Sequence, residues 1–227
     1  AVLYTRAGPE VAVASTKAFT AQITASYLVG IYLAELRGNK YPDEIATLLN
    51  QLDEIPAKIQ RILDTSEPIR EVARSMAAEG TVLFLGRHVG YPIALEGALK
   101  LKELAYIHAE GFAAGELKHG PIALIDQGMP VFVILPSPHG RESLHSKVLS
   151  NVQEVRARGA HTLVIAEEGD TEAASHAEHV FFIPPAPVLM TPLLTVIPLQ
   201  IFALELASAK GLDVDQPRNL AKSVTVE

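Results

Sequence analysis

A short segment near the middle of the chain carries two glutamates and a lysine at spacings that bring them together on a helix. Glu96, Lys100 and Glu103 are four and three residues apart, so they fall within about 60° of arc. The commonest fate of such residues is a surface ion pair contributing only about 0.2–0.5 kcal/mol. Apolar side chains flank this stripe on both sides: Leu95, Leu99, Ile93 and Leu104. We therefore expect a mostly packed helix whose charged stripe faces a cleft.

The same segment runs on into AAGELKHGP, where glycines and a proline indicate a loop. This loop carries Glu116, Lys118 and His119. Most lone histidines are structural, but an imidazole close to a carboxylate and an amine can transfer protons. The loop is therefore a candidate part of a catalytic site.

A carboxylate, an amine and an imidazole together suit sugar-phosphate isomerisation. That reaction needs a base that carries a proton between adjacent carbons, a cation beside the enolate oxygen, and an acid or base that opens the ring. It requires no metal, and the histidines lack the H-x-x-x-H spacing typical of zinc sites. We expect neither a metal nor another cofactor.

The composition argues against several other classes of function. The chain has 227 residues, a formal net charge of -7 and no long block of Lys and Arg, so no nucleic-acid-binding surface is expected. It has no cysteine, which excludes disulfides and a thiolate nucleophile and fits a reducing, cytoplasmic location. Two apolar stretches, 20–36 and 189–206, approach the length of a membrane span, but polar residues interrupt both. We interpret them as buried helices and expect no membrane partner.

The elements that must position the charged groups change character along the chain. Residues 2–4 are predicted as a strand, and Ser15 or Thr16 as the N-cap of a helix that reaches Leu36. Helical spacing continues over 41–64, where Pro56 should interrupt it, and a shorter helix is expected over 68–79. From residue 81, the apolar runs TVLFLG, MPVFVILP, HTLVIAE and HVFFIPP alternate with helical segments, and a final helix covers 191–209. This alternation predicts an α/β fold, a parallel sheet flanked by helices on both faces.

The chain divides into three parts. Residues 1–79 are interpreted as the end of a first unit with its connecting helices, 80–210 as a second and complete unit, and 211–227 as a C-terminal tail. The opening residues do not resemble a secretory leader, and we expect the chain to be a piece of a longer protein. A Gly-x-x-x-Gly motif, GRHVG, lies between strand and helix where α/β sheets bind ligands. It lacks the hydroxyls or lysine of a strong phosphate loop, so it is weak evidence by itself.

Three separated motifs resemble the isomerase domain of the glutamine:fructose-6-phosphate amidotransferases, also called isomerising glucosamine-6-phosphate synthases. They are EVAVASTKAFTAQ near the start, YPIALEGALKLKELAYIHAEGFAAGELKHGPIALI in the middle, and GLDVDQPRNLAKSVTVE at the end. The resemblance covers nearly the whole chain. It implies the sugar isomerase (SIS) fold, two flavodoxin-like units with an active site built partly from the C-terminal tail. This chain would hold one complete unit and the end of the preceding one.

The resemblance also implies catalytic roles for the matching residues. Glu103 would be the base that moves a proton between C1 and C2 of the sugar. Lys100 and His119 would serve ring opening and proton transfer, with Glu96 orienting and tuning Lys100. Lys222, in the tail, would lie at the sugar carbonyl.

Binding residues and partners are implied in the same way. The backbone at Val13 and Ala221, together with the Ser15 hydroxyl and Lys222, would hold the sugar phosphate, fructose 6-phosphate or glucosamine 6-phosphate. Ser15 could cap its helix at the same time. His119 would come from the neighbouring subunit of a homodimer.

The chain also departs from the family pattern. The family's glutaminase domain and its SQSGET-type phosphate loop have no counterpart in these 227 residues. The parent protein would convert fructose 6-phosphate and glutamine to glucosamine 6-phosphate and glutamate. We predict that this chain alone has weak activity or none.

Other interpretations remain open. A stand-alone sugar-phosphate isomerase or deaminase of the same fold would have no glutaminase domain upstream. A non-catalytic sugar-phosphate-sensing module could dispense with the base, although Glu103, Lys100, His119 and Lys222 are all present. The tail could also be a disordered end. Five further histidines are expected on the surface or in loops: His139, His145, His161, His176 and His179.

Overall fold

A five-stranded parallel sheet forms the centre of the chain in this computed structural model, which describes residues 2–139 and 144–222. Its strands lie in the order β2-β1-β3-β4-β5. Their bounds are β1 (Thr81–Gly86), β2 (His108–Ala113), β3 (Pro130–Ile134), β4 (His161–Glu167) and β5 (His179–Ile183). The predicted α/β fold with a parallel sheet is confirmed.

The central strands form where short apolar runs can be buried on both faces. All five residues of β3 are buried, as are nearly all of β1 and β4, as expected for a sheet covered by helices on both sides. The edge strand β2 is less buried: Ala109 is its one buried residue, and the other five are exposed or partly exposed. Its sequence, HAEGFA, was not predicted as a strand, yet these residues pair with β1 along its whole length.

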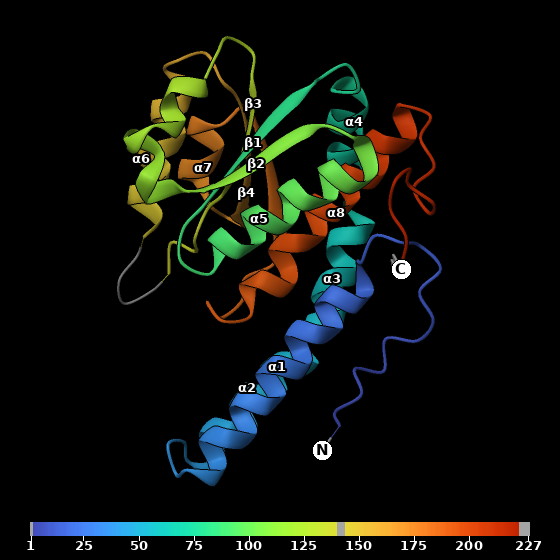
Figure 1. Cartoon of the computed structure of the whole chain (residues 1–227). Helices are drawn as coiled ribbons and strands as arrows, with labels where there is room; N and C mark the ends of the chain where they lie inside the picture. Colours follow the sequence, from blue (N-terminus) through green and yellow to red (C-terminus); the bar gives the residue numbers. More distant parts are fainter. Residues whose placement is uncertain (1, 140–143, 223–227) are drawn as a thin grey trace.

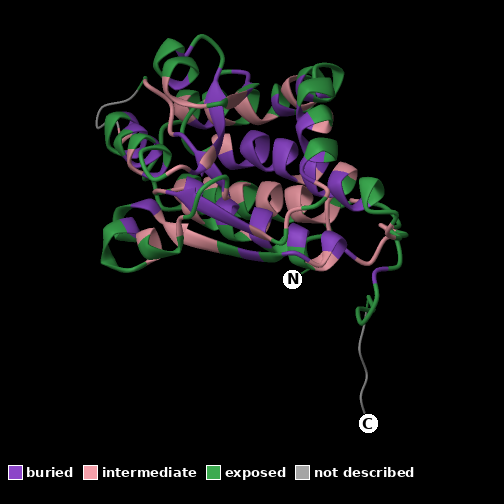
Figure 2. Ribbon diagram, turned by 90° about the horizontal axis from the view of Figure 1, so that it is seen from above, coloured by how far each residue is buried: buried purple, intermediate pink, exposed green. Residues whose placement is uncertain are grey.

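Helices cover both faces of the sheet (Figure 1). One face is covered by α3 (Ile55–Asp64), α4 (Glu67–Ser75), α5 (Gly90–Lys100) and α8 (Thr191–Ala209), whose apolar side chains form one core cluster with the strands. The opposite face is covered by α6 (His145–Arg156) and α7 (Thr171–His176), which help to form a second cluster. Figure 2 shows the buried residues gathered in this layered part, whereas the chain leading to the C-terminus is largely exposed.

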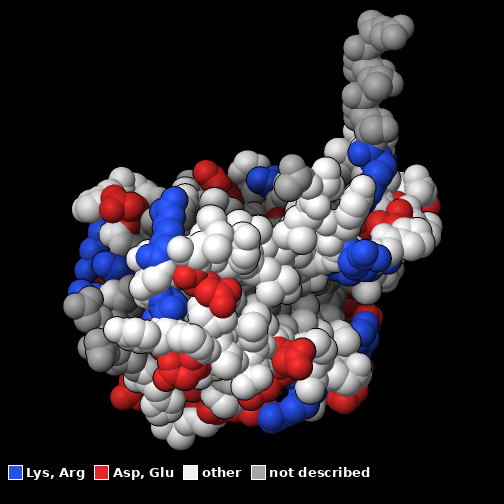
Figure 3. Space-filling view, turned by 90° about the horizontal axis from the view of Figure 1, so that it is seen from below, with Lys and Arg blue, Asp and Glu red and all other residues white. Residues whose placement is uncertain are grey.

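The first two helices project from this layered part (Figure 1). They are α1 (Lys17–Leu36) and α2 (Pro42–Asp53), and all twenty residues of α1 remain at least partly exposed. The break before α3 falls at Glu54, two residues before Pro56, as predicted. Seen from the side of this projection, the surface is mostly uncharged, with basic side chains scattered among acidic ones (Figure 3).

Helix α8 is the one helix of the described residues that is long and apolar enough, by length and composition, to cross a membrane. Of its most apolar window, 72% is buried inside the protein. It packs against α4 and α5. The expectation of a buried core helix is therefore confirmed for α8 and is wrong for α1, in which no residue is buried.

Several local predictions are corrected. Residues 2–4 are irregular rather than a strand, and the fourth helix ends at Ser75 instead of residue 79. The AAGELKHGP segment is a 3₁₀ helix, η2 (Ala114–His119), followed by η3 (Pro121–Leu124), rather than an open loop. His145 is buried at 5% exposure and pairs with Asp170 at 2.6 Å, because it begins α6 against the start of α7.

Candidate active site

A buried ammonium group between two carboxylates is the most unusual feature of the chain's interior. The Lys100 side chain is 2% exposed, and its Nζ donates to Oε2 of Glu103 and lies 3.4 Å from Oε1 of Glu96. The side chains of Glu96 and Glu103 are 10% and 23% exposed. The predicted charged stripe exists, and it is not a solvated surface pair, because a buried lysine requires such partners to offset the loss of its hydration.

The helix changes its geometry where it carries these groups. Helix α5 ends at Lys100, and residues 101–105 form a π-helical turn, η1 (Leu101–Ala105), that includes Glu103. Single π turns of this kind are found frequently at functional sites. Leu101 and Leu104 of the turn are buried in the core, so apolar packing fixes the turn and thereby the direction of the Glu103 side chain.

Burial acts on Glu96 more strongly than its cationic neighbour does. Desolvation raises the pKa of Glu96 above its ordinary value, and the nearby positive charge of Lys100 only partly opposes this. Its Oε1 atom is buried without a hydrogen-bond partner among the described residues, although it lies within ion-pair distance of Lys100. Glu96 is therefore suited to hold and tune Lys100, whereas Glu103 reaches toward solvent.

The four apolar residues that flank the charged stripe were expected to be packed, and this is wrong for two of them. Ile93 and Leu104 are 2% and 4% exposed, but Leu95 and Leu99 are 43% and 40% exposed. The reason is that α5 packs its other side on the sheet and on α8. Leu95 and Leu99 line an open groove between α5 and the start of α1, where Phe19 is another lining residue.

Lys222, from the other end of the chain, lies beside the segment that precedes α1. Its Nζ donates to Oε2 of Glu10 at 3.2 Å and to the carbonyl oxygens of Ala12 and Val13, each at 3.3 Å. The Val13 amide in turn donates to the carbonyl oxygen of Asp215 at 3.0 Å. The described part of the tail is therefore docked, and two of the sequence-predicted binding residues, Val13 and Lys222, lie together.

Glu10 is a functional candidate that sequence reasoning missed. Its Oε1 accepts the Thr16 amide at 3.1 Å and its Oε2 accepts Lys222. Burial alone would raise the pKa of Glu10, but the bonds from Thr16 and Lys222 hold it below its ordinary value. Glu10 thus takes the capping role expected of the Ser15 or Thr16 side chain: Thr16 occupies the N-cap position but makes no side-chain cap bond. No local sequence signal could have found it, because Glu10 lies six residues before the N-cap Thr16.

The other predicted site residues belong neither to the Lys100 cluster nor to the contact between Lys222 and Val13. His119 is 71% exposed, and its Nδ1 lies 2.7 Å from Oε2 of Glu116 at the end of η2. Its bonded partner is therefore on its own turn rather than Glu103 or Lys222. Ser15 is partly buried two residues after Val13, and Ala221 is exposed next to Lys222.

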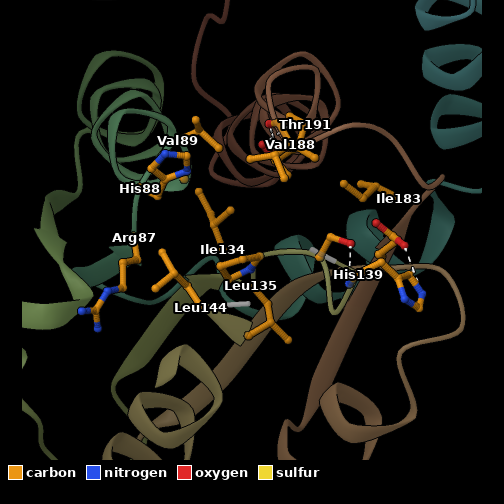
Figure 4. A pocket seen from close by; sticks show the side chains of 15 residues that line it. Arg87, His88, Val89, Ile134, Leu135, His139, Leu144, Ile183, Val188 and Thr191 are labelled. Carbon is orange, nitrogen blue, oxygen red and sulfur yellow. Dashed lines mark hydrogen bonds and ion pairs between the residues drawn. The ribbon is translucent and has the colours of Figure 1, made fainter. Parts of the chain in front are cut away.

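A separate cavity of about 290 Å³ lies at the carboxyl ends of the strands (Figure 4). Its walls are mainly apolar, and the guanidinium group of Arg87 points away from Ile134 and Val188 on those walls (Figure 4). The GRHVG motif borders this cavity, but its first glycine has a packing role. A Cβ atom at Gly86 would lie 2.2 Å from the carbonyl oxygen of Gly90. None of the three residues of the charged stripe, Glu96, Lys100 and Glu103, lines this cavity.

The chain is similar to known proteins over its whole length. A sequence pattern described as the SIS domain matches residues 75–210. The chain is 70% identical to an isomerizing glutamine–fructose-6-phosphate aminotransferase of Corynebacterium efficiens and 64% identical to one of Streptomyces coelicolor, in both cases over 227 residues. These matches cover 100% of this chain but only 36% and 37% of the two relatives, so the chain spans about a third of their length.

Solved structures agree with these similarities. The C-terminal domain of a glucosamine-fructose-6-phosphate aminotransferase from Francisella tularensis superposes with a TM-score of 0.85 at 37% identity, covering 92% of this chain and 58% of that one. A putative tagatose-6-phosphate ketose/aldose isomerase from Clostridium novyi reaches 0.79 at 16% identity, covering 96% and 56%. At that identity the second likeness concerns the fold alone.

Proposed function

This chain belongs to the SIS domain family, and from that premise we propose that it is the isomerase region of a glutamine–fructose-6-phosphate aminotransferase. The parent protein would make glucosamine 6-phosphate and glutamate from fructose 6-phosphate and glutamine. This region would bind the sugar and move its carbonyl group from C2 to C1. The observation that carries the proposal is the buried Lys100 between Glu96 and Glu103, within a chain 70% identical to such an enzyme.

Glu103 is the proposed base. Its carboxylate is held by the buried ammonium group of Lys100 on one side and is 23% exposed, so it can reach a ligand without losing its orientation. A positioned carboxylate that removes a proton from one carbon and returns it to the next contributes about 10²–10⁴-fold to the rate. Lys100, held in turn by Glu96, is the proposed donor to the sugar oxygen during ring opening.

The docked tail supplies the second half of the proposed site. Lys222 already lies against the Val13 carbonyl, and the backbone of Val13 and Ala221 with the Ser15 hydroxyl would hold the open-chain sugar. Lys222 carries the positive charge that an enolate oxygen requires. The contacts of Lys222 with Glu10 and Val13 favour a docked tail over a disordered end.

The proposed partners extend beyond this chain. His119 is exposed beside Glu116, which suits a residue that completes the site of a second subunit in a homodimer. Residues 1–79 would complete a first sugar isomerase unit, and a glutaminase domain would supply ammonia. We also propose a cytoplasmic location, in line with a chain that has no cysteine.

The experiment that tests this proposal is an assay of the full-length gene product with fructose 6-phosphate and glutamine. We expect glucosamine 6-phosphate and glutamate in equal amounts. Product formation from ammonia but never from glutamine would favour the stand-alone isomerase or deaminase. Binding of the sugar phosphate with no turnover of either substrate would favour the sensing module.

A further inference from the structure

Tyr106 joins the turn that carries Glu103 to the C-terminal tail. We propose that Tyr106 is a positioning residue that holds the tail docked, so that Lys222 is kept at the sugar-binding site. The inference rests on the proposed function only for the catalytic use of Lys222. The docking of the tail by Tyr106 is a separate, physical claim.

Two contacts join Tyr106 to the tail. Its hydroxyl oxygen accepts a hydrogen bond from the backbone amide of Arg218 at 2.6 Å. The guanidinium carbon of Arg218 lies 4.2 Å from the centre of the Tyr106 ring, within the range of a cation–π interaction. The two residues are 112 positions apart in the chain, so these contacts are a long-range link and not a local turn.

The backbone of Tyr106 is unusual in a way that these contacts explain. The residue ends the π-helical turn η1 in the left-handed region, with φ 55° and ψ 33°. Glycine or asparagine is the usual residue in that conformation, and a bulky aromatic residue there is an outlier. A tyrosine at this position is accounted for by what its ring and hydroxyl hold.

Tyr106 is one of several contacts between the described tail and the rest of the chain. The Asp215 carbonyl accepts the Val13 amide, Arg218 contacts Tyr106, and Lys222 contacts Glu10. Arg218 is exposed, but Pro217 before it is buried. The Tyr106 contact lies four residues before Lys222, so it restricts where that ammonium group can reach. It also lies three residues after Glu103, so it joins the two halves of the proposed site.

Limited proteolysis of the full-length protein tests this link without requiring activity. Trypsin cleaves after Arg218 only when the tail opens, and the rate follows the open population when closing is fast. Tyr106→Phe keeps the ring and removes the acceptor, so we expect cleavage to be about 3- to 10-fold faster. Tyr106→Leu also removes the ring, and a further increase of about 2- to 5-fold is expected.

The matched control is Tyr32→Phe, which removes a hydroxyl group from a tyrosine that is 58% exposed on α1. Its cleavage rate after Arg218 should equal that of the wild type. Equal rates for the wild type and Tyr106→Phe would overturn the proposal, as would a wild-type tail cut as fast as an unfolded peptide. Should Tyr106→Leu fail to fold, Tyr106→Phe alone decides, since it changes no packing volume.

Turnover measurements separate this inference from the proposed function. If both hold, the Tyr106 variants lower kcat in the same order as they speed cleavage, and added fructose 6-phosphate slows cleavage. If Lys222→Ala leaves turnover unchanged while the Tyr106 variants still release the tail, the positioning link stands and the proposed role of the tail in catalysis is refuted.

Discussion

The ammonium group of Lys222 lies 3.2 Å from Oε2 of Glu10, across 212 residues of sequence. The contact joins the segment before α1 to the tail, and Lys222 also donates to the Val13 carbonyl. Because Glu10 also accepts the Thr16 amide at the start of α1, a single carboxylate holds both the first helix and the tail. A docked tail with catalytic use and a docked tail without it make different predictions.

Removing residues 221–227 should abolish isomerisation by the full-length protein and spare its fold. We expect kcat to fall by at least about 100-fold, because the loss includes the cation proposed for the enolate oxygen. Thermal unfolding should shift by no more than about 2–4 °C, as for an exposed segment. Retained activity would show that the tail is docked without serving catalysis.

Replacing Lys100 with methionine should strongly destabilise the 227-residue chain. Two carboxylates would lose their buried counter-ion, and breaking a buried pair costs about 3–5 kcal/mol. Lys40→Met is the matched control, because the Lys40–Glu44 pair is 43% and 40% exposed and should contribute less than about 1 kcal/mol. Urea denaturation measures both; equal, small losses would contradict the burial of Lys100.

The contribution of Glu10 should depend on pH in one direction. Its pKa lies below the ordinary 4.5, although burial alone would raise it, because Thr16 and Lys222 donate to the ionised carboxylate. A lowered folded-state pKa contributes stability that is present above the unfolded value and is lost as pH falls through the folded value. The wild type should therefore melt above Glu10→Gln at pH 7, and the gap should close as pH falls below 4.5. A gap that widens on acidification would contradict this assignment.

The isolated chain should be a poor catalyst. Interactions with remote parts of a substrate contribute to the rate at its reacting carbons, and the phosphate loop of the resembled family has no counterpart in these residues. We expect its kcat/KM for fructose 6-phosphate, with ammonia as co-substrate, to be at least about 100-fold below that of the full-length protein. Comparable values for the two would show that the chain holds its own phosphate site.

The sequence predicts the central strands and the charged stripe well because both depend on local pattern. Short apolar runs bounded by turn residues are typical of buried strands, and the spacing of Glu96, Lys100 and Glu103 places them on one face of a helix whatever surrounds them. The edge strand β2 escaped prediction because its glycine and exposed polar residues suit a loop equally well.

Long-range contacts account for what the sequence could not predict. Nothing local indicates that Glu10 accepts Lys222 or that Tyr106 contacts Arg218, since each pair is joined only by the fold. The exposure of Leu95 and Leu99 likewise depends on what packs against α5. His145 was expected at the surface, but the fold buries it beside Asp170, with which it pairs.

The central claim is that Glu103 carries the proton between the two sugar carbons. Incubating the full-length protein with fructose 6-phosphate in deuterium oxide measures this step directly, because the proton removed from C1 exchanges with solvent. In Glu103→Gln we expect deuterium incorporation to slow by about 10²–10⁴-fold, with fructose 6-phosphate binding within a few-fold of wild type. Exchange by Glu103→Gln at the wild-type rate would contradict the account.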